Sequence, residues 1–384
     1  MNKINQLTEI HNSGKPYIIY KSKKGFDLYT NFSRKIVLNN KNINSFLNKK
    51  YKSKHKQTDL YIGFFGYELL NNLINIKIPS QKTINFPKGI FYKPEKKINI
   101  SNKLKYKSGD KFKRSKFKIN IDNNSYARIF NRFKKKIKSG ETYQIKICTK
   151  YKTKSKINPL DFFSKLSQIN LAPEAFMIRD KSYSIISCSP ENLITKKGSD
   201  ISTKPIAGTV KKTKVLNKTK ALNYFRKNLK ETKEHNMIVD MERNDLSRIC
   251  KVGSVRLSKQ KIVEEYKDLF HYVSLIKGKL KKNISNMDII KAMMPGGSVI
   301  GCPKISTLNL LNNQERENRN IYTGSFGYIK FNGDMRFNII IRSILNFKNV
   351  SEISVASGVV VDSNAKHEFN ENYIKAKALI DLFK

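Results

Sequence analysis

The sequence predicts an α+β fold. Strand-like and helix-like segments follow one another without the regular strand–helix alternation of a doubly wound parallel sheet. The chain has 384 residues, 39% of them hydrophobic, which is enough for a large core or two lobes. The clearest periodic segments are an amphipathic helix that starts near residue 125 and another at the C-terminal end, with several apolar strands between them.

Residues 1–115 predict strands and turns rather than long helices. The apolar runs YIIY (17–20) and DLYIGFFGYELL (59–70) are the clearest signals there. Residues 93–115 are polar and basic, so we expect them to connect two lobes. The predicted domains are therefore residues 1–115 and residues 116–384.

The second domain begins with the helix YARIFNRFKKKIK, which we expect to end at Gly140 because glycine is common just after a helix. Its apolar face is made by Tyr126, Ile129, Phe130, Phe133 and Ile137. The next segment, TYQIKICTKY, alternates and predicts a half-buried strand. The two faces of that strand carry Tyr143, Ile145 and Ile147 on one side and Gln144, Lys146 and Cys148 on the other.

The remaining elements follow from the same patterns. SYSIISCSPENLIT (182–195) predicts a strand closed by Pro190, residues 220–246 are mainly helical, and GSVRL (253–257) resembles a strand. Three late strands are expected at 323–331, 335–345 and 350–361. The chain closes with a helix from about Ala365 to Phe383, whose predicted buried stripe is Phe369, Tyr373, Ala376, Ile380 and Phe383.

Composition limits the function classes. The net charge of +46 raises the possibility of a basic nucleic-acid-binding protein, but the lysines are spread along the chain, so we interpret the charge as a solvated surface that attracts anions. No run of 18 apolar residues predicts a membrane span, and the N-terminus lacks the apolar region of a secretion signal. The cysteines are far apart in sequence, which indicates reduced thiols and a cytoplasmic protein.

The segment PGGSVIGCPK (295–304) resembles a phosphate-binding loop. A phosphate loop needs lysine and a hydroxyl residue where this chain has Cys302 and Pro303, and proline lacks the N–H that would face a phosphate. We therefore expect a tight turn between two helices, with glycines that let a ligand approach the backbone.

Two pairs of glutamates are candidate metal ligands. Glu231 and Glu234 share one helix face, and Glu368 and Glu371 share another. Carboxylate ligands suit Mg²⁺ held together with an anionic substrate. Spacing alone leaves the alternative that these glutamates pair with neighbouring lysines, for example Glu371 with Lys375.

Other candidates are single residues with two interpretations. Arg342 lies in the apolar run NIIIRSIL, where it could bind a carboxylate or extend to the strand end. Glu191 follows a strand and could reach a cleft or begin a helix. His235 and His271 are more often structural than catalytic.

Several long motifs together resemble the chorismate-utilising enzymes. The motifs that carry the resemblance, in chain order, are SPE (189–191), PIAGT (205–209), KEHNMIVDMERNDLSRI (233–249), PGGSVIGCPK (295–304), GSFGYIKFNGDM (324–335), IIIRS (339–343) and GVVVDS (358–363) followed by E-x-x-E. This family includes the first components of anthranilate synthase and aminodeoxychorismate synthase, and also isochorismate and salicylate synthases. The resemblance covers residues 125–383 and is weaker before them.

The resemblance implies a two-lobed chorismate-binding fold with packed central β-sheets and helices outside. Residues 1–115 would form an N-terminal lobe like that of anthranilate synthase component I, and residues 116–384 the chorismate-binding catalytic domain. It also implies a Mg²⁺ site at Glu234 and Glu371, supported by Glu231 and Glu368, with Glu191 as the general acid that protonates the departing hydroxyl. The implied substrate contacts are Gly208, Thr209, His271, Ser298, Tyr328, Arg342, Ser357 and Gly358.

The sequence departs from the family pattern at a few positions. Ala356 stands where a glycine is usual, Ile300 where Thr or Ser is common, and Arg336 where Asp or a small polar residue is frequent. Gln144 occupies the position of the lysine base of the water-using members, and glutamine cannot accept a proton from water at neutral pH. Ammonia from a separate glutamine amidotransferase subunit is therefore the expected nucleophile.

Local matches favour aminodeoxychorismate synthase component I, which makes 4-amino-4-deoxychorismate for 4-aminobenzoate and folate synthesis. GFFGYEL (63–69), NLAPEAF (170–176) and PGGSVIGCPK resemble its motifs. Ala207 points the other way, because some such enzymes place a nucleophilic lysine there. The alternative is anthranilate synthase component I, which makes anthranilate and pyruvate for tryptophan synthesis.

Overall fold

A computed structural model describes residues 3–76, 86–101, 104–108, 115–169, 171–213, 215–266 and 269–384. Within these ranges, the side chains of residues 207, 209, 211 and 230 are not described. Asn170, the first residue of the predicted NLAPEAF motif, lies outside them.

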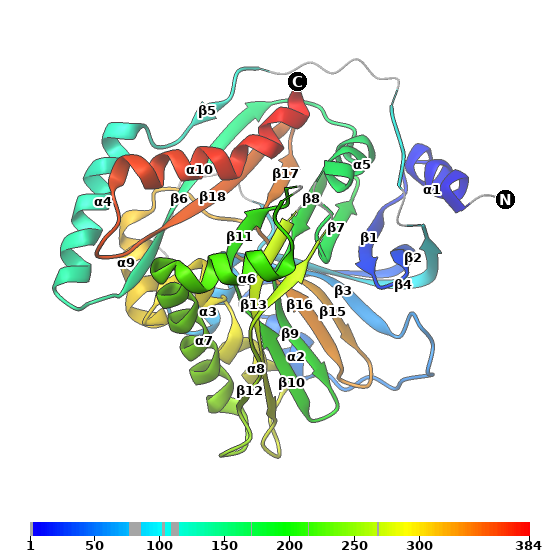
Figure 1. The fold of residues 1–384 in the computed structure, drawn as a ribbon. Coiled ribbons are helices and arrows are strands. Elements are labelled where there is room, and N and C mark those ends of the chain that lie inside the picture. Colours follow the sequence, from blue (N-terminus) through cyan, green and yellow to red (C-terminus); the bar gives the residue numbers. More distant parts are fainter. Residues whose placement is uncertain are drawn as a thin grey trace.

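Strands occupy the middle of the molecule and helices lie around them (Figure 1). The helices are α1 (Lys3–Asn12), α2 (Ile43–Asn48), α3 (Tyr67–Leu73), α4 (Asn123–Lys138), α5 (Pro159–Ile169), α6 (Lys218–Lys227), α7 (Leu229–Ile249), α8 (Asn286–Met293), α9 (Lys304–Gln314) and α10 (Ala365–Ile380), with short 3₁₀ turns η1 (Gly297–Val299) and η2 (Asp381–Phe383). The strands are β1 (Tyr17–Ser22), β2 (Gly25–Val37), β3 (Leu60–Phe65), β4 (Gly89–Ile100), β5 (Lys118–Ile119), β6 (Gln144–Lys154), β7 (Glu174–Arg179), β8 (Tyr183–Ser189), β9 (Asn192–Lys197), β10 (Asp200–Lys204), β11 (Ile206–Lys211), β12 (Arg256–Glu265), β13 (Leu269–Lys279), β14 (Gly301–Cys302), β15 (Ser325–Lys330), β16 (Met335–Asn338), β17 (Ser343–Phe347) and β18 (Val350–Val359). The α+β prediction is confirmed.

All the described strands belong to one hydrogen-bonded network of 18 strands. Strands from the first 115 residues pair with later ones: β1 with β7, and β3 with β15. The expected connection at 93–115 is wrong for its first part, because residues 93–100 continue β4, which pairs with β2. Helices α1, α2 and α3 also lie in this part of the chain, and each is at most ten residues long, which agrees with the expectation of few long helices here.

The helix α4 forms as predicted. The side chain of Asp122 caps it by accepting a hydrogen bond from the backbone N–H of Ser125, 2.7 Å away. Tyr126, Phe130 and Phe133 are buried on its apolar face. Gly140 follows the helix with φ of +78°, a conformation that glycine adopts without strain.

The buried face of α10 differs from the prediction. The residues that are buried are Glu368, Asn372, Ala376 and Leu379, whereas Tyr373 is 49% exposed. A polar side chain can be buried on this helix where another element supplies a hydrogen-bond partner. The Asn372 amide, for example, donates to Thr149 Oγ1 at 3.0 Å. Of the predicted stripe, Ala376 and Phe383 are buried, and Phe369 and Ile380 are partly buried against the core. The prediction is therefore wrong for Tyr373, and it missed the polar members of the buried face.

Strand β6 is buried on both of its faces, not half-buried as predicted. It pairs antiparallel with β18 over ten residues, from Lys154 opposite Val350 to Ile145 opposite Val359. Its apolar face contacts the core beneath α4 and α9. Its other face, which carries Gln144 and Lys146, covers an internal site instead of facing solvent.

Two predicted strands have different boundaries. The expected strand 335–345 is split into β16 and β17, and Arg342, with φ of +51°, lies at the break. The strand expected at 253–257 starts only at Arg256. The turn at 295–304 leads from α8 through η1 and β14 into α9, as predicted. Among the described helices, none is long and apolar enough to cross a membrane.

Candidate active site

A cavity of about 200 Å³ brings together several of the predicted site residues. Five of them line it: Gly208, Glu191, His271, Ser298 and Arg342. They come from segments far apart in the chain, at β8–β9, β11, β13, η1 and the break before β17. The other lining residues are Lys146, Pro190, Ile206, Val299, Tyr322, Ile341, Ser354, Val355, Ala356 and Lys375.

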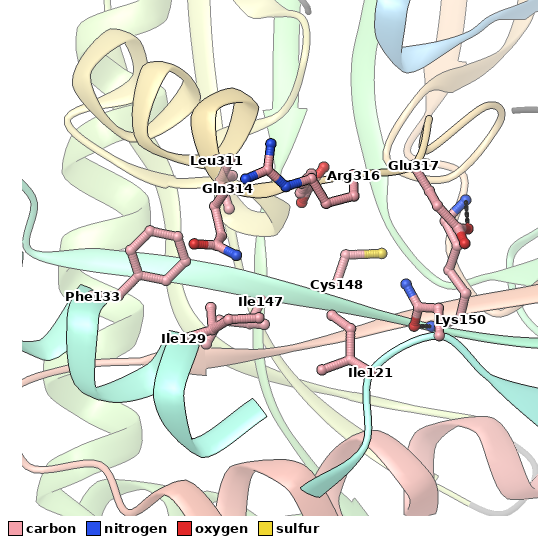
Figure 2. Close-up of a pocket in the computed structure, with 12 residues that line it drawn as sticks. Ile121, Ile129, Phe133, Ile147, Cys148, Lys150, Leu311, Gln314, Arg316 and Glu317 are labelled. Carbon is pink, nitrogen blue, oxygen red and sulfur yellow. Dashed lines mark hydrogen bonds and ion pairs between the residues drawn. The ribbon is translucent and has the colours of Figure 1, made fainter. Parts of the chain in front are cut away.

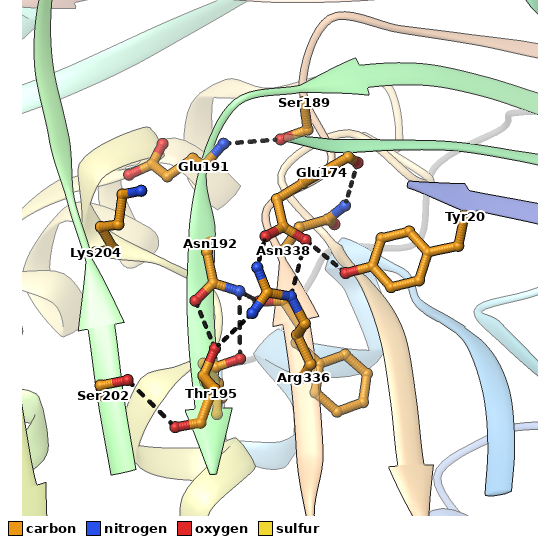
Figure 3. Close-up of polar contacts among 12 residues, drawn as sticks. Tyr20, Glu174, Ser189, Glu191, Asn192, Thr195, Ser202, Lys204, Arg336 and Asn338 are labelled. Carbon is orange, nitrogen blue, oxygen red and sulfur yellow. Dashed lines mark hydrogen bonds and ion pairs between the residues drawn. The ribbon is translucent and has the colours of Figure 1, made fainter. Parts of the chain in front are cut away.

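Glu191 is the buried acid of this cavity. Pro190 ends β8, and the Glu191 backbone N–H then donates to Ser189 Oγ at 3.3 Å (Figure 3). The residue is 5% exposed, and its carboxyl group accepts a hydrogen bond from Ser298 Oγ at 2.8 Å. Burial raises the pKa of Glu191 to about 7, because desolvation disfavours the charged form. Near neutral pH this carboxyl can therefore hold or release a proton.

Glu234, on α7, has the opposite electrostatic environment. Its Oε1 accepts hydrogen bonds from Gln144 Nε2 at 2.8 Å and from Lys146 Nζ at 3.2 Å. The Lys146 ammonium, with the two hydrogen bonds, lowers the pKa of Glu234 to about 2. Burial alone would lower the pKa of Lys146, but the attraction of the Glu234 carboxylate is stronger and raises it. Both groups are therefore ionised.

The second glutamate pair lies on α10. Glu371 Oε1 is 2.7 Å from Lys375 Nζ, which is the i+4 pairing that the sequence left as an alternative. Glu368 is buried, and ligand atoms of His367, Glu368 and Glu371 lie within 4.8 Å of one another.

The remaining glutamate, Glu231, approaches the lining of the cavity. A Cβ added to Gly208, whose φ is +73°, would lie 3.0 Å from Glu231 Oε2. The four glutamates thus offer hard carboxylate oxygens on two helices, a donor set that fits Mg²⁺. Glu234 and Glu371 would hold the ion, and Glu231 and Glu368 precede them by one helical turn on the same two helices.

Arg342 and His271 give the cavity a cation and a neutral ring. Arg342 reaches it because the backbone leaves the sheet at this residue; burial lowers its pKa. The guanidinium nonetheless stays protonated, since its ordinary pKa is far above neutral. Burial, with Arg342 nearby, lowers the pKa of His271 to about 4, so the imidazole is uncharged at neutral pH.

Other predicted contacts do not line the cavity. Tyr328, on β15, contacts Tyr20 edge to face, with ring centroids 6.4 Å apart. Ser357 Oγ donates to the Glu368 backbone oxygen at 2.9 Å and is hydrogen-bonded to the Tyr126 hydroxyl. The side chain of Thr209 lies outside the described part of the structure, although its backbone pairs opposite His271.

Gly358, the last of the predicted contacts, lies against two polar side chains of β6. A Cβ added there would lie 2.8 Å from Gln144 Nε2 and 2.9 Å from Lys146 Nζ. Gly358 therefore leaves space for the two side chains that donate to Glu234, and it does not line the cavity itself.

Lys146, Lys375 and Tyr322 are among the lining residues that sequence reasoning did not assign to the site. Lys146 could have been found, because it shares a strand face with Gln144 two residues earlier. The sequence suggested Lys375 only as a helical partner of Glu371. Tyr322 precedes β15 in a turn, where no periodic pattern marks it.

The positions that depart from the family pattern have different surroundings. Ala356 lines the cavity, and its backbone oxygen accepts from Lys375 Nζ at 3.0 Å. Ile300 is fully buried in the apolar core beneath α4 and α9. Arg336 forms an ion pair with the buried Glu174 (Figure 3).

A second cavity, of about 130 Å³, lies between α4, α9 and β6 (Figure 2). None of the predicted site residues lines it. Cys148 does, but burial raises the pKa of its thiol to about 12, so it is not a nucleophile near neutral pH. The predicted site residues that line a cavity are therefore at the first one.

Comparison with known proteins agrees with this assignment of the fold. The family model described as chorismate binding enzyme matches residues 7–381. The chain is 36% identical over 255 residues to the aminodeoxychorismate synthase component 1 of Bacillus subtilis, covering 66% of this chain and 54% of that protein. It is 30% identical over 347 residues to an anthranilate synthase component I-like protein of Synechocystis, covering 83% and 72%. The chain thus spans about half the length of the Bacillus relative.

Solved structures show the same fold. The anthranilate synthase component I of Streptococcus pneumoniae superposes with a TM-score of 0.76 at 26% identity, covering 96% of this chain and 90% of that one. The menaquinone-specific isochorismate synthase of Escherichia coli superposes with a TM-score of 0.77 at 15% identity, covering 96% and 89%, which is a likeness of fold alone. The predicted chorismate-binding fold is confirmed.

Proposed function

Because the chain belongs to the family of chorismate binding enzymes, we propose that it is the first component of an aminodeoxychorismate synthase. It would convert chorismate and ammonia to 4-amino-4-deoxychorismate. The single observation that carries an elimination chemistry is the Glu191–Ser298 pair, a buried acid with a pKa of about 7 in a cavity lined by three cations. Chorismate is a dicarboxylate, and it must lose a hydroxyl group for an amine to enter.

Each group of the cavity has a role in this proposal. Arg342 supplies a guanidinium that suits a carboxylate of the substrate. Glu191 donates its proton to the departing hydroxyl, and Ser298 holds the carboxyl in position for that transfer. Neutral His271 offers a hydrogen bond without adding charge.

A divalent ion is part of the proposal. When bound, Mg²⁺ would supply charge neutralisation at a substrate carboxylate. Glu234 and Glu371 would hold it. Gln144 donates to Glu234 and fixes its orientation, and it has no basic atom with which to activate water.

Two lines support the amine product. The Bacillus relative bears the name of this activity. Three local motifs of this chain also resemble those of aminodeoxychorismate synthases. A separate glutamine amidotransferase would supply ammonia, in keeping with the designation "component 1" of the relatives. We propose a cytoplasmic location.

Anthranilate synthase component I is the second candidate. The specific observations in its favour are the Synechocystis relative, which matches over more of both chains, and the Streptococcus structure. Ala207 also fits it, because alanine offers no nucleophile in the PIAGT segment.

Product identification separates the two. The protein is incubated with chorismate, Mg²⁺ and ammonium, and the mixture is separated by chromatography with and without a lyase that converts 4-amino-4-deoxychorismate to 4-aminobenzoate. We expect 4-aminobenzoate only when the lyase is present. Anthranilate with pyruvate, formed without the lyase, would move the assignment to the second candidate. Glu191→Gln is the matched control for both products.

A further inference from the structure

We propose that Lys146 is a built-in cation that competes with divalent metal ions for Glu234 and so weakens the metal affinity of the site. The inference rests on the proposed function, because it takes Glu234 as a metal ligand. It concerns a residue that the sequence pattern placed on the outer face of a strand.

The first observation is the crowding at one carboxylate oxygen. Glu234 Oε1 accepts from both Gln144 Nε2, at 2.8 Å, and Lys146 Nζ, at 3.2 Å. A metal ion that binds this oxygen has to displace at least one of these donors. Displacing an ammonium costs more than displacing a neutral amide, because the ion pair is stronger in a buried site.

The second observation is that the chain makes room for this ammonium. A Cβ at position 358 would lie 2.9 Å from Lys146 Nζ and 2.8 Å from Gln144 Nε2, so any residue larger than Gly358 would move both groups. The Lys146 side chain is only 12% exposed. Glu371 and Glu191 lie close enough to add to the attraction that keeps it charged.

The third observation distinguishes Lys146 from the other lysine of the cavity. Lys375 pairs with Glu371 at 2.7 Å and also donates to the Ala356 backbone oxygen, so it keeps a partner if a metal takes the carboxylate. Among the described residues, Lys146 Nζ donates only to Glu234. Losing that contact would leave a buried ammonium without its acceptor, which is costly.

The expected size follows from competition within the molecule. The apparent dissociation constant for the metal is the intrinsic one divided by the fraction of molecules in which Glu234 is available. If the ammonium occupies the carboxylate in at least nine of ten molecules, removing it tightens metal binding at least ~10-fold.

The test is Mg²⁺ binding by calorimetry, without chorismate, for the wild type and Lys146→Met. The matched control is Lys152→Met. Lys152 lies on the same strand as Lys146 but outside the cavity, and its Nζ pairs with Glu317 Oε2 at 2.5 Å. We expect Lys146→Met to lower the Kd for Mg²⁺ at least ~10-fold, and Lys152→Met to change it less than ~2-fold. Lys146→Arg, which keeps the charge, should bind as weakly as the wild type.

Thermal unfolding provides a second readout, with Lys146→Gln as an alternative variant if Lys146→Met does not fold. Adding Mg²⁺ should raise the Tm of the uncharged variant by more than it raises the Tm of the wild type, since tighter binding stabilises more. An unchanged or weaker Kd in both uncharged variants, or no binding at all, overturns the inference.

The inference and the proposed function fail differently. If the wild type and Lys146→Met have equal Kd values for Mg²⁺, and the wild type turns over chorismate with Mg²⁺, only the competition between Lys146 and the metal for Glu234 is overturned. Tighter binding by Lys146→Met, without turnover by the wild type, would support the competition and count against the proposed function.

Discussion

The hydrogen bond between Ser298 and Glu191 leads to a prediction about the pH dependence of the reaction. A general acid must be protonated in the free enzyme, so kcat/KM for chorismate should fall as pH rises through the pKa of Glu191, which is about 7. Ser298 stabilises the ionised carboxylate by donating to it, and this lowers the pKa below what burial alone would give. Ser298→Ala removes that donor, so the pKa of Glu191 should rise. The basic limb of the pH profile of kcat/KM, where the rate falls, should then move to higher pH.

The magnitude follows from the strength of that bond. A hydrogen bond to a charged group contributes about 1.5–3 kcal/mol. The protonated carboxyl also interacts with the serine hydroxyl, so only part of this energy distinguishes the two protonation states. Because 1.36 kcal/mol corresponds to one pH unit, the lower end of the range predicts a shift of about one unit. The basic limb should therefore move from about pH 7 to about pH 8.

The assay is the loss of chorismate, followed at several pH values with free ammonia held constant. Ser354→Ala is the matched control, because Ser354 lines the same cavity from β18. Its basic limb should stay where the wild type's is. A limb in Ser298→Ala that stays in place or moves to lower pH would refute the role of Glu191 as the titrating acid. Glu191→Gln should lose at least ~10²-fold in kcat and leave no such limb.

Three further predictions test other parts of the site and the fold. Glu234→Gln should reduce Mg²⁺-dependent turnover at least ~10²-fold, as expected for the loss of a main electrostatic group, and full wild-type activity in EDTA would contradict the metal assignment. Tyr322→Ala should raise KM for chorismate while Tyr328→Ala leaves it within ~2-fold, since only the first lines the cavity; equal effects in steady-state kinetics would contradict this placement. Arg336→Ala should destabilise the protein by about 3 kcal/mol in denaturant unfolding, because it leaves the buried Glu174 carboxylate without its cation, whereas a change under about 1 kcal/mol would mean that solvent compensates the charge.

Much of the fold could be predicted, because most elements have one apolar face. The helix α4 has a continuous apolar stripe, a capping aspartate and a terminal glycine, and all three agree. In α10 the same rule holds only in part: Ala376 and Phe383 are buried as expected, but Glu368 and Asn372 are buried too, while the aromatic side chain of Tyr373 stays at the surface. Periodicity detects an apolar core but cannot detect a polar partner on another element.

The site was predictable where a motif contained it and unpredictable where the tertiary fold created it. Glu191 and Ser298 belong to separate motifs, but their hydrogen bond depends on how η1 meets the end of β8. Tyr322 carries no pattern, because it lies between α9 and β15, outside any helix or strand. The strand break that exposes Arg342 to the cavity likewise has no signal within the apolar run that contains it.

Strand β6 shows how a pattern can predict a strand correctly while the role of one face is missed. Alternation correctly placed Gln144 and Lys146 on one face, and a polar face ordinarily lies toward water. In this chain α7 presents Glu234 to both side chains. The polar residues are therefore buried and paired. A polar strand face that is covered instead of exposed to water is thus a feature of this candidate site. Because a cation on a strand needs an acidic partner once that face is covered, the glutamates of residues 229–249 are a second feature, besides the strand face shared with Gln144, that could have identified Lys146 as a site residue.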